Sequence, residues 1–187
     1  MTTTKITRQQ AAALFLLTGS VRHVLEGCAL RVFSPMRARW EATNGSAVVL
    51  LQWGAGDDLH GLEPGVYTVE RKDLLRRAKM PAKLWDADVD GVIPIKRDDS
   101  DKPRWPNVPY VIPSEDGQQL EPAAAAHGMT TAVLDIPSKV YRAMFSTYGL
   151  TRTVWTITMG GALQVQHWHV ERDGVTIDLY MMPARLN

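Results

Sequence analysis

Hydrophobic and polar residues follow the same order of periodicities twice along the chain, and the first copy lies near the amino terminus. Thr7 stands three residues ahead of Gln10, as in a capping box, where a hydroxyl and an amide satisfy free N–H groups at a helix start. An apolar run over 11–17 follows, and Gly19 is a natural helix stop. The pattern therefore predicts a helix that starts after Thr7 and ends before Gly19.

Strand-like alternation follows this helix. Apolar residues recur at every second position over 28–33 and over 38–42, the period of a strand with one buried face. Asn44-Gly45 then favours a hairpin, because both central residues of a type I′ turn need positive φ. Residues 46–53 supply the next predicted strand.

The last third of the chain repeats this order. Asp135 and Pro137 are predicted to open a helix, with the proline where its missing N–H costs nothing, and Tyr141, Phe145 and Tyr148 follow at helical spacing. Three strand-like stretches separated by glycine turns come next, at 155–159, 163–167 and 175–181. The repetition suggests a duplicated β-α-β-β-β unit, and therefore an α+β fold.

The middle of the chain is less regular. Residues 65–69 predict a strand and 71–80 a short helix, while the stretch after them is rich in acidic and turn-forming residues. Residues 114–128 have little patterning, which is typical of a linker. We therefore predict a domain over 1–113, a linker over 114–128 and a half-domain over 129–187.

Composition restricts the classes of function. Apolar residues make up 45% and charged residues 22% of the 187 positions, with a net charge of +1, so a nucleic-acid role must depend on where the charge lies. The single cysteine, Cys28, fits a reduced, cytoplasmic setting. The apolar run over 11–17 is too short to span a membrane, and we expect a soluble protein that is not a membrane partner.

Basic side chains gather on the predicted helices. Lys72, Arg76 and Lys79 recur at i, i+4 and i+7, so they would share one helix face. A solvated helix surface is an equally good interpretation for any single one of them. The other basic residues in or near predicted helices are Lys5, Arg8, Arg71, Arg77, Lys83, Lys139 and Arg142.

Patterns that indicate catalysis or metal binding are weak. His167 and His169 share a strand face, but no third ligand is patterned beside them along the sequence, so a pair of surface histidines is favoured over a zinc site. Residues 86–97 partly match a calcium-binding loop but end in Arg97, where that loop needs glutamate. Cys28 fits a small core residue better than a nucleophile. We therefore expect no catalytic residue, no metal and no cofactor.

Three stretches resemble the DNA sliding-clamp family, in particular the β subunit of bacterial DNA polymerase III. Met-Pro-Ala-Arg-Leu at 182–186 resembles the family's Met-Pro-Met-Arg-Leu terminus, with Ala184 in place of methionine. Residues 105–113 resemble the stretch Phe-Pro-Asp-Tyr…Val-Ile-Pro that passes between clamp domains. Residues 24–30 and 40–45 resemble the Val-Leu-x-Gly…Ala-Thr-Asp-Gly pattern of the first clamp hairpin. The short chain looks like the reduced clamp-like proteins of phages and mobile elements.

The resemblance implies a DNA-clamp-like fold of repeated β-α-β-β-β motifs, with antiparallel sheets outside and helices on one face. It implies a non-enzymatic processivity or tethering factor in DNA replication, which acts as a homo-oligomer on duplex DNA. The basic residues named above would then attract DNA phosphates without sequence preference. DNA polymerase, or another protein with a clamp-binding motif, would dock in a pocket bordered by Tyr180, Met182, Pro183, Arg185 and Leu186.

An alternative keeps the clamp fold but belongs to another class of function. In this hypothesis the protein does not encircle DNA, and it binds replication partners or the host clamp to modulate replication. The low net charge and the short chain favour the alternative, whereas the basic cluster around Arg76 favours the processivity factor.

Overall fold

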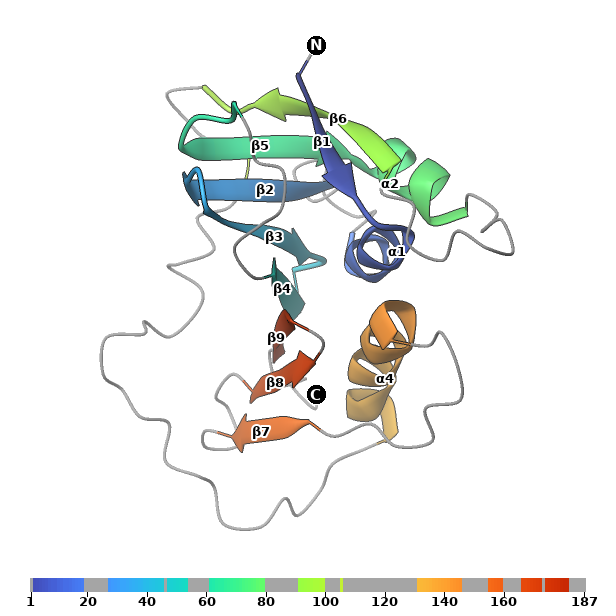
Figure 1. Ribbon diagram of the computed structural model, residues 1–187. Coiled ribbons are helices and arrows are strands. Elements are labelled where there is room, and N and C mark those ends of the chain that lie inside the picture. The colour runs from blue at the N-terminus through green and yellow to red at the C-terminus, as the bar shows by residue number, and fades with distance from the viewer. Residues whose placement is uncertain are drawn as a thin grey trace.

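The chain folds around one antiparallel sheet with helices on one side, as the computed structural model shows (Figure 1). The strands run in the order β1-β6-β5-β2-β3-β4-β9-β8-β7. The structure describes residues 2–18, 27–45, 47–53, 61–79, 91–99, 105, 131–145, 155–159, 166–172 and 174–181.

The described elements alternate in the order that the sequence predicts for a repeated unit. The helices are α1 (Arg8–Leu16), α2 (Arg71–Lys79) and α4 (Thr131–Phe145). The strands are β1 (Thr2–Ile6), β2 (Gly27–Ser34), β3 (Arg37–Thr43), β4 (Ala47–Trp53), β5 (Gly65–Glu70), β6 (Gly91–Arg97), β7 (Thr156–Met159), β8 (Gln166–Arg172) and β9 (Val175–Met181). The α+β prediction is therefore confirmed.

The ladder between β4 and β9 makes one sheet out of the two ends of the chain. It runs antiparallel from Ala47 opposite Met181 to Trp53 opposite Val175. The predicted domain 1–113 and half-domain 129–187 thus share a continuous sheet. The predicted linker over 114–128 lies outside the described residues, so the boundary itself stays a prediction.

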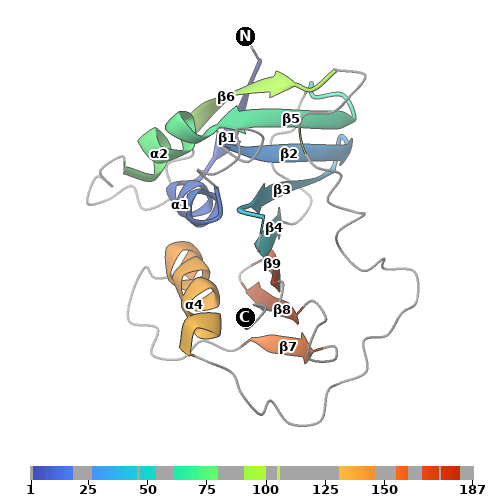
Figure 2. The ribbon, with the colours of Figure 1, turned by 180° about the vertical axis from the view of Figure 1, so that it is seen from behind.

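All three described helices cover the same side of the sheet, which we call the helix face; the opposite side is the outer face. Figures 1 and 2 show α1 between α2 and α4 from both directions, and α1 contacts both neighbours. Because strand side chains alternate between faces, each strand contributes every second residue to the core. One row of paired residues on the helix face is fully apolar, and it runs through Cys28, Ala42, Val49, Leu179 and Trp168.

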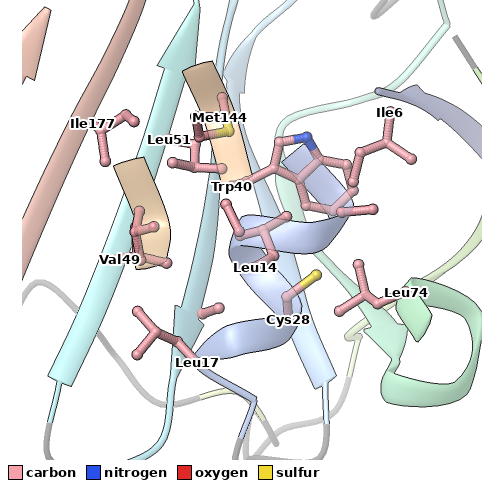
Figure 3. Packing of buried hydrophobic residues seen from close by; sticks show 14 of the residues in the cluster. Ile6, Leu14, Leu17, Cys28, Trp40, Val49, Leu51, Leu74, Met144 and Ile177 are labelled. Atoms are coloured by element: carbon pink, nitrogen blue, oxygen red, sulfur yellow. The ribbon is translucent and has the colours of Figure 1, made fainter. Parts of the chain in front are cut away.

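The core lies between this row and the helices. Figure 3 shows Leu14 of α1 among Trp40, Cys28 and Leu74, and all four side chains are buried. On the other half of the sheet, Met144 of α4 belongs to the same cluster as Ile177. A single apolar core therefore extends under both the amino-terminal and the carboxy-terminal strands.

The predicted capping box is confirmed in atomic detail, and the predicted hairpin is confirmed in its position along the chain. Thr7 and Gln10 form the capping box of α1: the Gln10 N–H donates to Thr7 Oγ1 at 3.1 Å and the Thr7 N–H donates to Gln10 Oε1 at 2.9 Å. The hairpin between β3 and β4 is confirmed, but Thr43 pairs with Val48 and the Asn44 N–H donates to the Ala47 carbonyl, so Asn44 is not a central residue of a type I′ turn as predicted. Gly45 lies at φ 89°, and the Ala47 N–H donates to Asn44 Oδ1 at 2.9 Å.

Three element predictions were wrong in extent. The last helix starts at Thr131 rather than at Asp135, so Pro137 lies inside it; the buried face with Val140 and Tyr141 holds this irregular helix in place. Strand β8 continues to Arg172, beyond the predicted end at residue 167. The stretch assigned to acidic turns contains β6, which pairs with β1 over Gly91–Ile95 and with β5 only at Lys96 and Arg97.

Candidate functional site

Exposed basic side chains occur on each of the three described helices. The prediction that Lys72, Arg76 and Lys79 share an exposed face of α2 is confirmed, since all three are exposed while Leu74 is buried. On α4, Lys139 and Arg142 are exposed and Val140, Tyr141 and Met144 are buried. Arg8 is exposed at the start of α1, and Lys5 is exposed on β1. Lys83 lies outside the described residues.

Arg77 joins two elements of the fold and is not a surface cation, which corrects its place among the candidate DNA contacts. Its side chain is buried, and its Nε donates to the Ile6 carbonyl at 3.1 Å. A Cβ added at Gly91 would lie 2.3 Å from Arg77 Nε, so the bare backbone of β6 lets the guanidinium reach β1. Arg77 therefore joins α2 to β1 and is removed from the candidate DNA contacts.

Two other arginines hold α1 against α2 at opposite ends. Arg8 Nε donates to the Ala78 carbonyl at 3.2 Å, close to the negative end of the α2 dipole. Arg71 Nε donates to Thr18 Oγ1 at 3.0 Å, and its guanidinium carbon lies 4.5 Å from the centre of the Phe15 ring. The two helices are thus antiparallel.

Basic residues outnumber acidic ones on α2. Lys72 Nζ pairs with Glu70 at 2.5 Å, and this hydrogen bond raises the pKa of the lysine. Both side chains are exposed, so the pair contributes little to stability. Arg76 and Lys79 lie further along α2, where Asp73 is the only acidic residue of the helix.

The outer face of the sheet carries a buried carboxylate. Glu41 is fully buried and accepts hydrogen bonds from Arg31 Nε at 2.7 Å and Arg39 Nε at 2.8 Å. Trp105 Nε1 donates to the same carboxylate at 3.0 Å, and its ring packs on Leu50 in a small apolar cluster. The resemblance placed residue 105 in a segment that passes between clamp domains, and here its side chain lies against the outer face.

Beside this cluster, the register of the ladders brings two histidines to one aspartate. Asp178 of β9 pairs with Leu50 on one side and His169 on the other. Asp178 Oδ1 lies 2.8 Å from His167 Nε2 and 2.8 Å from His169 Nδ1. The ring of Tyr180 stacks on that of His167, with centroids 4.4 Å apart and planes 2° from parallel.

Sequence reasoning missed Asp178 as the third member of this group. Burial acts to raise the pKa of the Asp178 carboxyl, but the hydrogen bonds to His167 and His169 outweigh it and leave that pKa below its ordinary value. The signal was present in the sequence, because the turn predicted at Asp173-Gly174 implies the observed register, in which Arg172 lies opposite Val175 and His169 opposite Asp178. The sequence pattern showed no third ligand for the two histidines, whereas the structure brings Asp178 beside both of them.

Among the residues expected to border a peptide pocket, the structure describes Tyr180 alone. It is partly buried on β9, where it packs against the apolar cluster that contains Val48, Leu50 and Trp105. Met182, Pro183, Arg185 and Leu186 lie outside the described residues. No helix in the described part of the chain combines the length and the apolar character needed to cross a membrane.

The arrangement of one continuous antiparallel sheet with helices on one face resembles the fold of the DNA sliding clamps. The DNA polymerase III subunit beta from Pseudomonas aeruginosa matches with a TM-score of 0.59 at 12% identity, over 100% of this chain and 66% of that chain. The sliding clamp from Bartonella birtlesii, solved with griselimycin bound, matches with a TM-score of 0.58 at 12% identity, over 98% of this chain and 66% of that chain.

The present chain therefore spans less than two thirds of the length of these two proteins. No protein-family model matches the sequence, and no curated protein matches it. At this level of identity the likeness establishes the fold, which confirms the clamp-like architecture predicted from the three short motifs.

Proposed function

We propose that this protein is a non-enzymatic, sliding-clamp-like processivity or tethering factor that acts as a homo-oligomer on duplex DNA. The observation that carries the proposal is the exposed basic surface of the helix face, formed by Arg8 of α1, by Lys72, Arg76 and Lys79 of α2, and by Lys139 and Arg142 of α4. Lys5 and Lys83 are proposed as peripheral contributors.

A surface of this kind suits movement along DNA. Attraction between lysine or arginine and phosphates releases counterions and does not depend on base sequence. A few exposed cations on long side chains can exchange one phosphate for the next, whereas buried, fixed contacts would hold the duplex in one register. The buried Arg77 and the half-buried Arg71 therefore position the helices, and the exposed residues provide the attraction.

The sheet supports oligomer formation through its edges. β1 and β7 are the terminal strands of the described sheet, and an edge strand presents backbone groups that can pair with another chain. A chain that spans 66% of the length of a clamp subunit would need several copies to surround a duplex.

We also propose that a clamp-binding peptide, such as a segment of a DNA polymerase, docks beside the carboxy-terminal strand. Tyr180, Met182, Pro183, Arg185 and Leu186 would border this pocket, and Ala184 would make it shallower than methionine would. An apolar cleft with adaptable methionines is a common way to hold a peptide anchor. The outer apolar cluster next to Tyr180 supports this location.

A second candidate function is a non-encircling interaction protein that binds replication partners or the host clamp. The near-neutral net charge favours it, because the total charge provides little long-range attraction to DNA. In that case the peptide-binding end would act alone, and the helix face would have no DNA partner.

Retention on DNA circles separates the two functions. A ring-forming protein loaded on nicked circular DNA should remain bound when excess competitor DNA is added, and should leave after the circle is linearised. The double variant Arg76→Glu with Lys79→Glu should weaken DNA binding by about 10-fold and reduce the salt dependence of the affinity, since each lost phosphate contact lowers the slope by about one.

The matched control makes the same change in net charge on the outer face. Arg37→Glu with Lys96→Glu alters two exposed cations on that face and should leave DNA affinity nearly unchanged. Equal losses in both double variants would show that binding depends on total charge alone. A single-chain solution mass with no preference for circles would eliminate the ring and favour the interaction protein.

A further inference from the structure

We propose that His167, His169 and Asp178 form a binding site for a divalent transition-metal ion of the zinc type on the outer face of the sheet. The three possible ligand atoms, one from each residue, all lie within 4.8 Å of one another. The site is separate from the basic surface of the helix face, so it adds a property that the proposed DNA function does not require.

The backbone presents the three side chains together. His167 and His169 are two residues apart on β8, so they point to the same face, and Asp178 lies directly opposite His169 on β9. Directly paired residues in an antiparallel ladder have Cβ atoms roughly 5 Å apart, close enough for their side chains to bind one ion. Two strands joined by a short turn give a rigid frame for such a site.

The contacts among the three side chains already bring their ligand atoms close together. Asp178 Oδ1 lies 2.8 Å from both His167 Nε2 and His169 Nδ1, so these two nitrogens already converge on one point. Ligand atoms around a tetrahedral zinc ion lie about 3.3 Å apart, given bonds of about 2.0–2.1 Å. A small rotation of the carboxylate therefore opens the space that an ion needs.

The proton balance of binding is simple. An ion can bind only where His167 Nε2 and His169 Nδ1 each offer a lone pair, so a proton carried on either nitrogen must leave it. The displaced proton moves to the other ring nitrogen, which is His167 Nδ1 or His169 Nε2. Partial exposure of both histidines lets solvent carry out this exchange of tautomers.

The donor set selects the class of metal. Two imidazole nitrogens with one carboxylate oxygen suit Zn²⁺, and also Ni²⁺ and Cu²⁺, whereas Mg²⁺ and Ca²⁺ prefer oxygen ligands throughout. Three protein ligands leave at least one coordination position for water or for a ligand from another molecule. The ion would tie β8 to β9 immediately before the carboxy-terminal segment, with the Tyr180 ring stacked on His167.

Calorimetric titration with ZnCl₂ and absorption spectroscopy with Co²⁺ test the site directly. The wild-type chain should bind one Zn²⁺ per chain, and Co²⁺ should give the visible bands of a low-symmetry site. His169→Gln and Asp178→Asn should each weaken Zn²⁺ binding by more than the roughly 10–100-fold that loss of an outer-shell partner causes. Circular dichroism on the same samples would verify that both variants are folded.

The chain offers a matched control in its other three histidines. A triple variant with His23, His60 and His127 changed to Gln should keep full affinity and a stoichiometry of one. Loss of binding in this triple variant, or unchanged affinity in His169→Gln, would overturn the proposal. One ion per two chains would also overturn it, since the site would then lie between copies. DNA affinity should not change when Zn²⁺ is added. A negative result in the metal titration would therefore leave the proposed DNA function untouched, and a negative DNA-binding result would leave the metal site untouched.

Discussion

At the scale of single residues, Glu41 is the clearest case of a charge that the fold must satisfy. The carboxylate is fully buried, and Arg31, Arg39 and Trp105 all donate to it. A buried ion that loses its partner leaves an uncompensated charge, which costs more than the pair itself contributes.

We therefore expect Glu41→Gln to lower the free energy of unfolding by about 3 kcal/mol, because both arginines lose their counter-charge in a poorly solvated place. Urea unfolding followed by tryptophan fluorescence measures the change. Glu171→Gln, at an exposed position on β8, is the control and should stay within about 0.5 kcal/mol of wild type. Equal unfolding midpoints for the two variants would contradict the structural role given to Glu41.

Residue-level chemistry was only partly predictable from the sequence. Exposure of Lys72, Arg76 and Lys79 followed from helical spacing, which is a local property. The position of Arg77 did not, because its burial depends on β1 and on the bare backbone at Gly91, far away in the sequence. Asp178 lies between these cases. Its partner His169 is on the neighbouring strand, but the hairpin between β8 and β9 fixes which residues lie opposite each other.

At the scale of elements, α4 contains the one described helical proline. Inside a helix, proline removes a backbone hydrogen bond and its ring collides with the preceding turn, at a cost of about 3 kcal/mol. The sequence placed Pro137 at a helix start, where no such cost arises. The helical residues ahead of Pro137 must therefore be stabilised by packing, and the partly buried Ile136 packs against the core.

Pro137→Ala should consequently stabilise the protein by about 1 kcal/mol. The substitution restores a backbone hydrogen bond and removes the steric clash, and this gain exceeds the loss of about 1–2 kcal/mol from two buried methylene groups. Thermal unfolding followed by circular dichroism measures this. Pro35→Ala, in the exposed turn between β2 and β3, should instead destabilise slightly by widening the unfolded ensemble. A destabilised Pro137→Ala variant would indicate a helix that starts at the proline.

Elements with local signals were predicted well, and those without them were not. The capping box and the glycine of the Asn44-Gly45 turn are short-range features, and α1 and the β3–β4 hairpin follow them. Strand β6 contains Pro94 and has acidic neighbours, so its local signal for a strand is weak despite its β-branched residues. Its ladder with β1 provides the stabilisation that the local sequence lacks.

At the scale of the whole molecule, the β4–β9 ladder is the feature that the sequence did not predict. It pairs Ala47 with Met181, and no turn connects them, so no local pattern could set the register. Short family motifs nevertheless indicated the clamp-like architecture. Among the described strands, β1 and β7 stand at the two ends of this continuous sheet.

One of these ends, β7, has an apolar residue suited to pairing with another copy. Ile157 is 37% exposed there, although its partner Trp168 on β8 is buried. If edge pairing builds the oligomer, a lysine at this position should block it, because charged side chains on edge strands oppose association. We expect Ile157→Lys to reduce the solution mass of the assembly towards that of one chain and to abolish retention on circular DNA.

Analytical ultracentrifugation measures that mass. The control is Val92→Lys, which changes a more exposed apolar residue on β6, a strand that already has neighbours on both sides. Its mass should equal that of the wild type, and a fall in both variants would indicate non-specific apolar association instead of edge pairing. If the oligomer persists in Ile157→Lys, the contact between copies does not involve β7. The helix-face cations could then still bind DNA, but the ring would have to close through other surfaces.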